Sequence, residues 1–297
     1  RAVKRQIAAM GVDSFEVGVL IPGDKDQDRM LLHEWTTVEL LGALKKLKRH
    51  NAMGRHIFIR PLGSQGLVFV DDLTVGALQS IANDGLKPAC VIESSPQNYQ
   101  AWFRISREGI ARELASAVGK VLARRYNGDQ NSTDWRHFGR LAGFTNRKPK
   151  YVDATGKYPY VLLTESTTQA NDLVDSEAIT KLLDDAKSVC KEEANANRAR
   201  LERLRKRRGG VKNSVDLPLP AVFYKTQFDK LLSQFGEDLD LSGADWRIGQ
   251  AMAEAGYHPD QVCEAMLEAS PKLSLRKSGH VADYVNRTVS KLFGELN

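Results

Sequence analysis

Alternating hydrophobic and polar positions in the first 165 residues predict a sheet, and segments with helical periodicity lie between its strands. Six short segments have the composition or alternation of strands: 15–20, 55–60, 67–70, 89–92, 99–105 and 158–164. Three segments repeat hydrophobic residues at helical spacing: 36–49, 75–82 and 107–125. Tight turns at 63–66 and 94–98 join strands that must be antiparallel. We therefore expect an α/β (α+β) domain with a mixed sheet over residues 1–170.

After residue 175 only helical periodicity remains. One helix is predicted over 176–208, about 50 Å long, with Ser176 as its N-cap and Gly209-Gly210 as its end. Residues 209–220 hold two glycines and two prolines, which indicates a linker. Four more helices are predicted: 221–235, 242–255, 258–269 and 279–295. We expect a first domain (1–170), a long connecting helix with a linker (171–220) and a C-terminal all-α helix bundle (221–297).

The composition is that of a folded globular protein. Of 297 residues, 42% are hydrophobic and 27% are charged, which excludes a largely disordered chain. Charges interrupt every apolar run before the ~18 residues that a membrane span needs, so no membrane partner is expected. The three cysteines are far apart and form no C-x-x-C, which favours a reducing cytoplasm over a disulfide or zinc scaffold.

Charge is distributed unevenly along the chain. From residue 213 on there are 8 basic and 12 acidic residues, a net charge of −4, which leaves +10 for residues 1–212. The first part is basic enough to attract a polyanion. Residues 198–208 hold seven cations against one acid, Glu202. This run fits a helix C-terminus, where cations offset the macrodipole, and it also fits contact with a DNA backbone.

Two adjacent acids form the sharpest candidate site. Asp71 and Asp72 follow four apolar residues, 67–70. Carboxylates at the end of a buried strand need a partner, and Mg²⁺ or Mn²⁺ is the usual one near phosphates. The alternative is that Asp72 caps the helix that starts near Thr74. Neighbouring strand residues point to opposite faces, so both acids serve one site only if the strand ends or twists there.

Two further segments carry polar groups suited to phosphate chemistry. Residues 128–148 place the acids Asp129 and Asp134 before a basic loop with glycine and asparagine at turn positions. That order suits a metal-binding carboxylate followed by a phosphate-binding loop; a solvated polar loop is the alternative. Residues 93–102 place hydroxyls before a turn and polar side chains on the returning strand, which also describes an ordinary hairpin.

Taken together, these segments resemble the archaeo-eukaryotic primase superfamily, and in particular the RepB-type DNA primases of IncQ-like mobilisable plasmids. The resemblance covers roughly residues 15–165, in the order found in that family: FEVGVL, LKRHNAMGRHIFIRP, LVFVDDL, VIESSPQNYQAWFRI and GDQNSTDWRHFGRLAGFTNRKPK. The superfamily usually has D-x-D where this chain has adjacent acids. A histidine expected in the hairpin is replaced here by Gln100.

The resemblance implies roles for individual residues. Asp71, Asp72 and Asp129 would form a metal-binding catalytic triad, with Asp134 as the alternative third acid. The nucleoside triphosphate would lie along five other residues: Ser94, Gln100, Arg140, Asn146 and Lys148. Contact with phosphate at Gln100 would be neutral.

The expected function is a template-dependent DNA primase that makes primers on single-stranded plasmid origin sites by two-metal (Mg²⁺ or Mn²⁺) nucleotidyl transfer. Two alternatives remain open: a non-catalytic, single-stranded-DNA-binding replication initiator and a metal-dependent nuclease. The six histidines form no H-x-H, H-x-E or H-x-x-x-H, which disfavours a histidine-metal relaxase. Expected partners are the origin strand, nucleoside triphosphates and, by resemblance, a plasmid helicase or a fused mobilisation relaxase.

Overall fold

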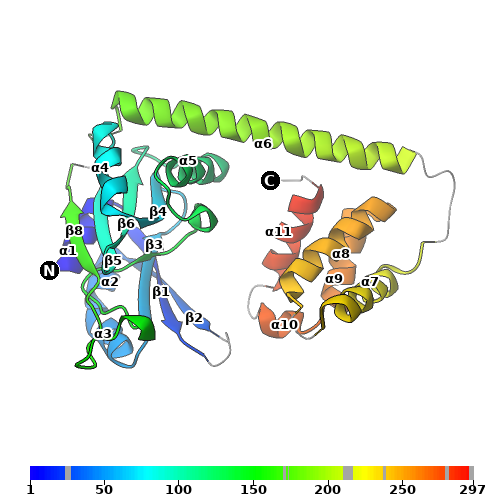
Figure 1. The fold of residues 1–297 in the computed structure, drawn as a ribbon, viewed down its shortest axis with the longest axis horizontal. Helices are drawn as coiled ribbons and strands as arrows, with labels where there is room; N and C mark the ends of the chain where they lie inside the picture. Colours follow the sequence, from blue (N-terminus) through cyan, green and yellow to red (C-terminus); the bar gives the residue numbers. More distant parts are fainter. Residues whose placement is uncertain are drawn as a thin grey trace. The chain divides into compact units, whose positions relative to one another are not determined.

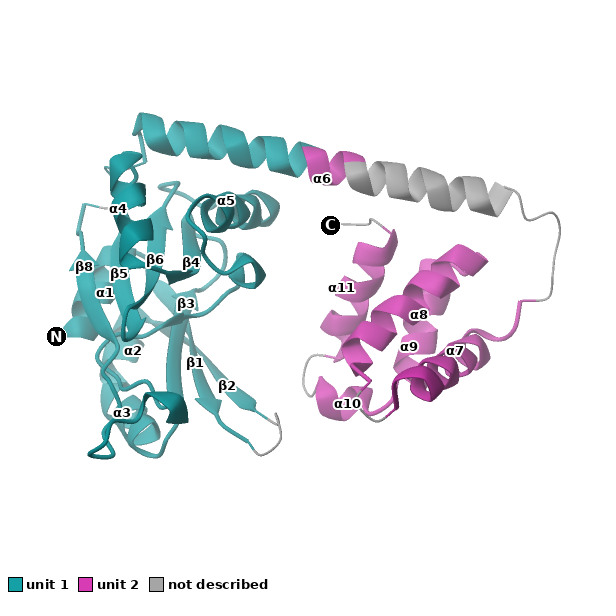
Figure 2. Cartoon of the chain, viewed as in Figure 1, with its two compact units in different colours: residues 1–191 teal, residues 192–297 magenta. Residues whose placement is uncertain are grey.

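The structure is a computed structural model of the chain. It describes residues 1–23, 28–169, 172, 174–209, 217–236, 239–277 and 281–293, with the backbone alone over 196–209. The basic run at 198–208 therefore has its side chains outside the described set. The chain divides into two compact units, residues 1–191 and 192–297 (Figure 2), which we describe one at a time.

Unit 1 contains two four-stranded antiparallel sheets (Figure 1). The first has the order β2-β1-β3-β7 and consists of β1 (Ser14–Ile21), β2 (Arg29–Thr36), β3 (His56–Pro61) and β7 (Gly139–Arg140). The second has the order β4-β6-β5-β8 and consists of β4 (Leu67–Leu73), β5 (Cys90–Ser95), β6 (Asn98–Arg104) and β8 (Leu162–Ser166). The predicted hairpin around residues 94–98 is confirmed as the turn between β5 and β6.

Helices connect and cover these strands. Those of unit 1 are α1 (Ala2–Met10), α2 (Thr37–Gly42), α3 (Leu44–Ala52), α4 (Val75–Asn83), α5 (Arg112–Arg125), the 3₁₀ turns η2 (Gln130–Ser132) and η3 (Pro149–Tyr151), and the first half of α6 (Glu177–Gly209). The predicted helix over 36–49 is divided at Ala43 into α2 and α3. Thr36 caps α2, because its hydroxyl accepts a hydrogen bond from the Glu39 amide. The predicted long helix is confirmed as α6, whose Ser176 accepts from the Ile179 amide.

The predicted α+β class is confirmed, but the sheet is not one mixed sheet. Every pairing between the described strands is antiparallel. The helical crossovers explain this. Helices α2 and α3 connect β2 to β3, which flank β1, and α4 connects β4 to β5, which flank β6. Each crossover therefore passes over one strand that runs the opposite way. Strand β2 escaped prediction because it is an edge strand that carries charges such as Arg29 and Glu34.

The second sheet is buried on both faces. Along β4, Leu67 and Phe69 belong to a core shared with the first sheet, α1, α2 and α3. Val68 and Val70 point the other way, into a core shared with α4, α5 and α6. This two-sided burial is why the segment reads as a continuous apolar run. It also leaves the polar end of β4, rather than either face, as the place for chemistry.

Unit 2 is helical, as predicted. It contains the rest of α6 and α7 (Pro220–Phe235), α8 (Leu241–Ala255), α9 (Pro259–Ala269), α10 (Leu273–Arg276) and α11 (Val281–Phe293). The one-turn α10 was not predicted, since four residues carry no periodicity. The core holds apolar side chains such as Ile248, Met252 and Val289. Among the described helices of both units, none combines the length and hydropathy needed to cross a membrane.

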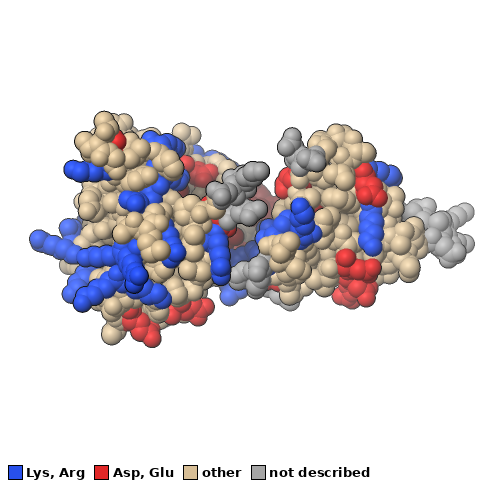
Figure 3. Space-filling model, turned by 90° about the horizontal axis from the view of Figure 1, so that it is seen from below, with Lys and Arg blue, Asp and Glu red and all other residues tan. Residues whose placement is uncertain are grey.

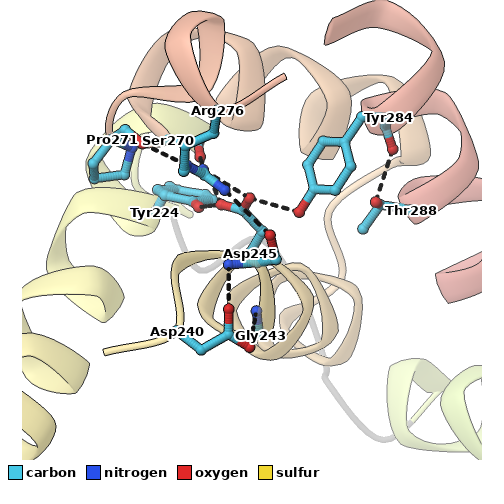
Figure 4. Close-up of polar contacts among 10 residues, drawn as sticks. Tyr224, Asp240, Gly243, Asp245, Ser270, Pro271, Arg276, Tyr284 and Thr288 are labelled. Carbon is cyan, nitrogen blue, oxygen red and sulfur yellow. Dashed lines mark hydrogen bonds and ion pairs between the residues drawn. The ribbon is translucent and has the colours of Figure 1, made fainter. Parts of the chain in front are cut away.

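A buried carboxylate organises the polar part of this bundle (Figure 4). Asp245 is 1% exposed and accepts hydrogen bonds from four side chains: Tyr224, Ser270, Arg276 and Tyr284. The Arg276 guanidinium also donates to the Pro271 carbonyl and the Ser270 hydroxyl. Four donors satisfy the charge, so Asp245 has a structural role that links α7, α8, α10 and α11.

Candidate active site

The two adjacent acids lie in a β-bulge. Strand β4 pairs Val70 with Ala101 and Leu73 with Tyr99, so Asp71 and Asp72 together face the single residue Gln100. Asp72 has a left-handed backbone, with φ of 56°. A bulge changes the direction in which successive side chains point, which removes the geometric obstacle that adjacent strand residues raise. The competing role for Asp72 is filled by Thr74, whose hydroxyl accepts from the Ala77 amide and caps α4.

Gln100 connects Asp71 to Arg140. Its amide nitrogen donates to Asp71 Oδ1 (3.0 Å), and its amide oxygen accepts from the Arg140 backbone nitrogen (2.7 Å). Gln100 is 4% exposed, and both ends of its amide are engaged. The Arg140 guanidinium lies 2.7 Å from His56 Nδ1 and 4.6 Å from the centre of the Phe58 ring. One hydrogen-bonded chain thus joins β4, β6, β7 and β3.

A second chain starts at Asp72. The Asn98 amide donates to Asp72 Oδ1 (2.7 Å), and the Ser94 hydroxyl donates to Asn98 Oδ1 (3.0 Å). The buried Asn146 amide donates to the Ser94 carbonyl (2.7 Å), and its oxygen accepts from the Lys148 backbone nitrogen (3.3 Å). The exposed Lys148 side chain therefore follows directly on a loop anchored to the hairpin.

Asp129 is the third acid that adjoins this site. Its backbone nitrogen donates to the Asp71 carbonyl (3.0 Å), and its carboxylate caps η2 by accepting from the Asn131 amide and the Ser132 hydroxyl. Asp134 forms its contacts elsewhere: it accepts from the Arg136 amide and lies 4.0 Å from the Arg136 guanidinium. Of the two predicted third acids, Asp129 is the one bonded to the β4 bulge.

The electrostatics of the site favour an anionic ligand beside a cation. Burial lowers the pKa of Arg140 to about 10, so its guanidinium stays charged at neutral pH although the residue is buried. Burial, and then Arg140 and Lys148, lower the pKa of His56 to about 4, so its imidazole is neutral. No ion pair with a described carboxylate compensates Arg140, and a bound phosphate would do so.

The Asp71 carboxylate, by contrast, would be stabilised by a bound cation. Burial raises the pKa of its carboxyl, although the Asp72 amide and Gln100 donate to it. The Ser132 hydroxyl and the Asn131 amide lower the pKa of Asp129. A divalent cation beside these oxygens would offset the desolvation of Asp71, and hard carboxylate oxygens are the ligands that Mg²⁺ and Mn²⁺ prefer. Within the described residues no group of three or more metal-ligating side chains is assembled, so the fit rests on donor chemistry.

Three residues near the site went unassigned in the sequence. His137 stacks on Phe69, with ring centroids 5.6 Å apart. Burial lowers its pKa, and the carboxylates of Asp71, Asp129 and Asp134 oppose this shift. His56 and Asn98 complete the two hydrogen-bonded chains. No spacing marks these positions, because each comes from a different strand or loop; the one available signal was that His137 lies within the basic loop.

Comparison with known proteins gives consistent matches over both units. Residues 22–188 match the RepB DNA-primase N-terminal domain, and residues 239–292 match the RepB DNA-primase C-terminal helical domain. Mobilization protein A of Escherichia coli is 37% identical over 99% of this chain. The chain spans 40% of the length of that relative. A DNA primase of Acidithiobacillus ferrooxidans is 25% identical over 96% of this chain and 83% of its own length.

Two solved structures are also similar. The crystal structure of primase RepB' is 36% identical, with a TM-score of 0.58, over 99% of this chain and 93% of its own. The catalytic domain of primase RepB' in complex with initiator DNA is 38% identical, with a TM-score of 0.56, over 65% of this chain and 96% of its own. The predicted resemblance is confirmed: the chain belongs to the RepB DNA-primase family.

Proposed function

We propose that this chain is a template-dependent DNA primase that makes primers on single-stranded plasmid origin sites and so initiates replication. The observation that carries the proposal is the meeting of the β4 acids, Arg140 and the 146–148 loop through two hydrogen-bonded chains. Acids beside unpaired cations are what nucleotidyl transfer needs, since a triphosphate and a divalent cation must be held together. The relatives named DNA primase, and the RepB' domain crystallised with initiator DNA, support the same activity.

The residues divide into binding and positioning roles. Arg140, His56 and Lys148 would hold the triphosphate, with Arg140 as the least hydrated charge. Gln100, Ser94 and Asn146 are positioning residues in this proposal, because their polar atoms are already engaged within the protein. Gln100 in particular orients the Asp71 carboxylate and fixes β7 at the same time. This differs from the direct phosphate contact that the resemblance implies for Gln100.

The carboxylates of Asp71, Asp72 and Asp129 would hold the metal. When bound, Mg²⁺ or Mn²⁺ would lower the pKa of the attacking 3′-hydroxyl and neutralise charge on the phosphates. Burial lowers the pKa of His137 although the neighbouring carboxylates oppose the shift, and its ring stacks on Phe69. A neutral imidazole here can accept or donate a hydrogen bond at the edge of the acidic group without adding a positive charge.

A primer-synthesis assay distinguishes the candidates. Purified chain is incubated with a single-stranded origin template, labelled nucleoside triphosphates and Mg²⁺ or Mn²⁺. A primase incorporates label in a template-dependent manner and releases pyrophosphate. Binding without incorporation would instead establish a non-catalytic initiator, and shortened template would establish a nuclease. Origin strand and nucleoside triphosphates are thus the proposed partners. A plasmid helicase, or a relaxase fused as the length of mobilization protein A suggests, would act alongside.

A further inference from the structure

The solvent-facing side of α3 carries only positive charge. Lys45, Lys46, Lys48 and Arg49 are all exposed, and at 100° per residue they lie within about 160° of one another around the helix. Leu47 is buried on the opposite side. The helix LKKLKRHNA contains no acid. Figure 3 shows Lys and Arg side chains crowded over one face of unit 1.

These cations lack the ion pairs that some other exposed cations of unit 1 have. No ion pair joins them to a carboxylate of the described residues. By contrast, Arg107 pairs with Asp175, Arg125 with Asp185 and Lys187 with Asp184. Burial lowers the pKa of His50, and the charges of Arg55, Lys46 and Arg49 lower it further. Positive charge that no acid compensates is a site for a polyanion.

An aromatic stack adjoins the cations. The rings of His33 and Trp35, on β2, are parallel within 3° with centroids 4.6 Å apart. Lys46 lies 5.9 Å from the centre of the Trp35 ring. Both rings are half-buried. Burial and Lys46 lower the pKa of His33, so the imidazole is a neutral flat ring at neutral pH, suited to stacking on a nucleobase.

The same surface leads into the candidate active site. At the end of α3, the Asn51 amide oxygen accepts from the Thr145 backbone nitrogen (2.9 Å), and the Ala52 carbonyl accepts from the Arg147 guanidinium (3.3 Å). Asn146 follows Thr145 in the sequence and Lys148 follows Arg147, and both belong to the hydrogen-bond series that starts at Asp72. The cations Arg147 and Lys148 therefore lie on a loop that joins the end of α3 to the site.

We propose that the α3 surface, defined as Lys45, Lys46, Lys48, Arg49 and the His33–Trp35 stack, binds single-stranded DNA as the template strand. The cations contact phosphates, and one base stacks on His33. Cations that follow a backbone, combined with an aromatic platform, give binding with little dependence on sequence. The inference rests on the proposed primase function only in calling the strand a template; the binding itself is independent of it.

The test measures binding of the full chain to a fluorescent single-stranded oligonucleotide, without nucleotides or metal, at several salt concentrations. The triple variant Lys45→Gln, Lys48→Gln, Arg49→Gln should bind more weakly. The plot of log K against log salt should also become less steep by about 2, because each of the three lost phosphate contacts contributes about 0.7 to the steepness. The matched control is Lys4→Gln, Lys87→Gln, Lys181→Gln, three exposed lysines of unit 1 outside this surface. It should leave the slope unchanged.

The stack is tested with a pair of substitutions. His33→Ala should reduce affinity roughly tenfold, within the range for loss of one stacked base, and His33→Phe should restore it. A 4-thiothymidine oligonucleotide should crosslink to the peptide that contains His33 and Trp35. Unchanged slope and affinity in the triple variant, or equal losses in the control, would overturn the proposal. If the variant and the control differ in binding as expected but the chain makes no primers, the proposed primase function is overturned and the α3 surface remains a binding site for single-stranded DNA.

Discussion

Gln100 shows how one uncharged side chain holds opposite charges in place. Its amide donates a hydrogen bond to the Asp71 carboxylate and accepts one from the Arg140 backbone nitrogen. A histidine here could not serve both partners in the same way when protonated, because both ring nitrogens would then be donors. The adjacent acids and the glutamine therefore belong together: a bulge with two residues opposite one brings both acids around this amide.

We expect Asp71→Asn, Asp72→Asn and Asp129→Asn each to lower primer synthesis by at least about 10²-fold while leaving template affinity largely intact, because charge stabilisation in the transition state is lost and remote DNA contacts are not. Asp134→Asn is the matched control and should be much milder, since Asp134 pairs with Arg136. Steady-state primer synthesis and oligonucleotide binding measure the two effects. A severe Asp134→Asn defect with an active Asp129→Asn variant would place the third acid at Asp134.

Asp71→Asn should also stabilise the fold. The pKa of Asp71 is raised from 3.8 by burial, so above pH 3.8 the folded chain holds this proton more tightly than the unfolded chain. Stability is therefore lost as pH rises through the raised pKa. We expect the Tm of the variant at pH 7 to exceed that of the parent chain, because a buried charge is removed. The gain should disappear near pH 3.5; a gain equal at both pH values would show a cause other than ionisation.

Lys148→Ala should act mainly on nucleotide binding. Lys148 is exposed and reaches the site from a loop anchored by Asn146, so it offers a point charge to phosphate. We expect the KM for the incoming nucleotide to rise about tenfold, as for loss of one charged hydrogen bond, with kcat nearly unchanged. Lys157→Ala, another exposed lysine of the same region, is the control. An unchanged KM would assign Lys148 to the template side.

At the scale of elements, the turn after α5 decides where the third acid lies. Gly128 has no side chain, and a Cβ there would come within 2.8 Å of the Asp71 carbonyl and 2.9 Å of the Val70 side chain. The same close approach lets the next residue, Asp129, donate its amide to that carbonyl. The contact between the α5–η2 turn and β4 thus depends on a glycine, which couples the first acids to the third.

Gly128→Ala should therefore separate Asp129 from Asp71 and lower primer synthesis by at least tenfold, since displacements near 1 Å at a reacting centre cost up to about 10²-fold. Gly42→Ala is the control, because a Cβ at Gly42 meets no atom within 4 Å. Circular dichroism should show both variants folded. Normal synthesis by Gly128→Ala would mean that the turn can shift without moving the carboxylate.

At the scale of the whole molecule, the two units have separate cores. The two apolar clusters of unit 1 draw on residues up to 190, and that of unit 2 begins with Phe223 and Tyr224. The helical bundle from residue 213 on has a net charge of −4, and several of its cations are engaged: Arg276 with Asp245, Arg287 with Asp283 and Lys277 over the Tyr284 ring. Arg276 thus serves the polar core of the bundle.

A fragment that ends near Gly210 should fold and keep nucleotide incorporation on a generic single strand, because the site and the α3 surface lie within residues 1–191. It should lose preferential priming of the origin strand, if base and shape readout lie in unit 2 while phosphate contacts remain. Incorporation by the fragment and the full chain is compared on an origin strand and a scrambled strand. Undiminished origin priming by the fragment would leave unit 2 as a structural or partner-binding module.

The sequence alone determined the features that depend on neighbours along the chain. Apolar runs and caps identified most strands and helices, including α6, because helix and strand periodicity and capping are local. The order of motifs identified the family and proposed eight site residues and an alternative. These proposals needed no tertiary contact, since each motif is a short segment.

Tertiary structure decided what depends on contacts between distant segments. The bulge that pairs Asp71 and Asp72 with Gln100 needs β6 as a partner, and an irregular register leaves no trace in β4 by itself. The preference for Asp129 over Asp134 depends on one hydrogen bond to β4. The edge strand β2 and the helices that cross over β1 and β6 turned an expected mixed sheet into two antiparallel ones. In each case the deciding interaction joins residues far apart in sequence, where periodicity carries no information.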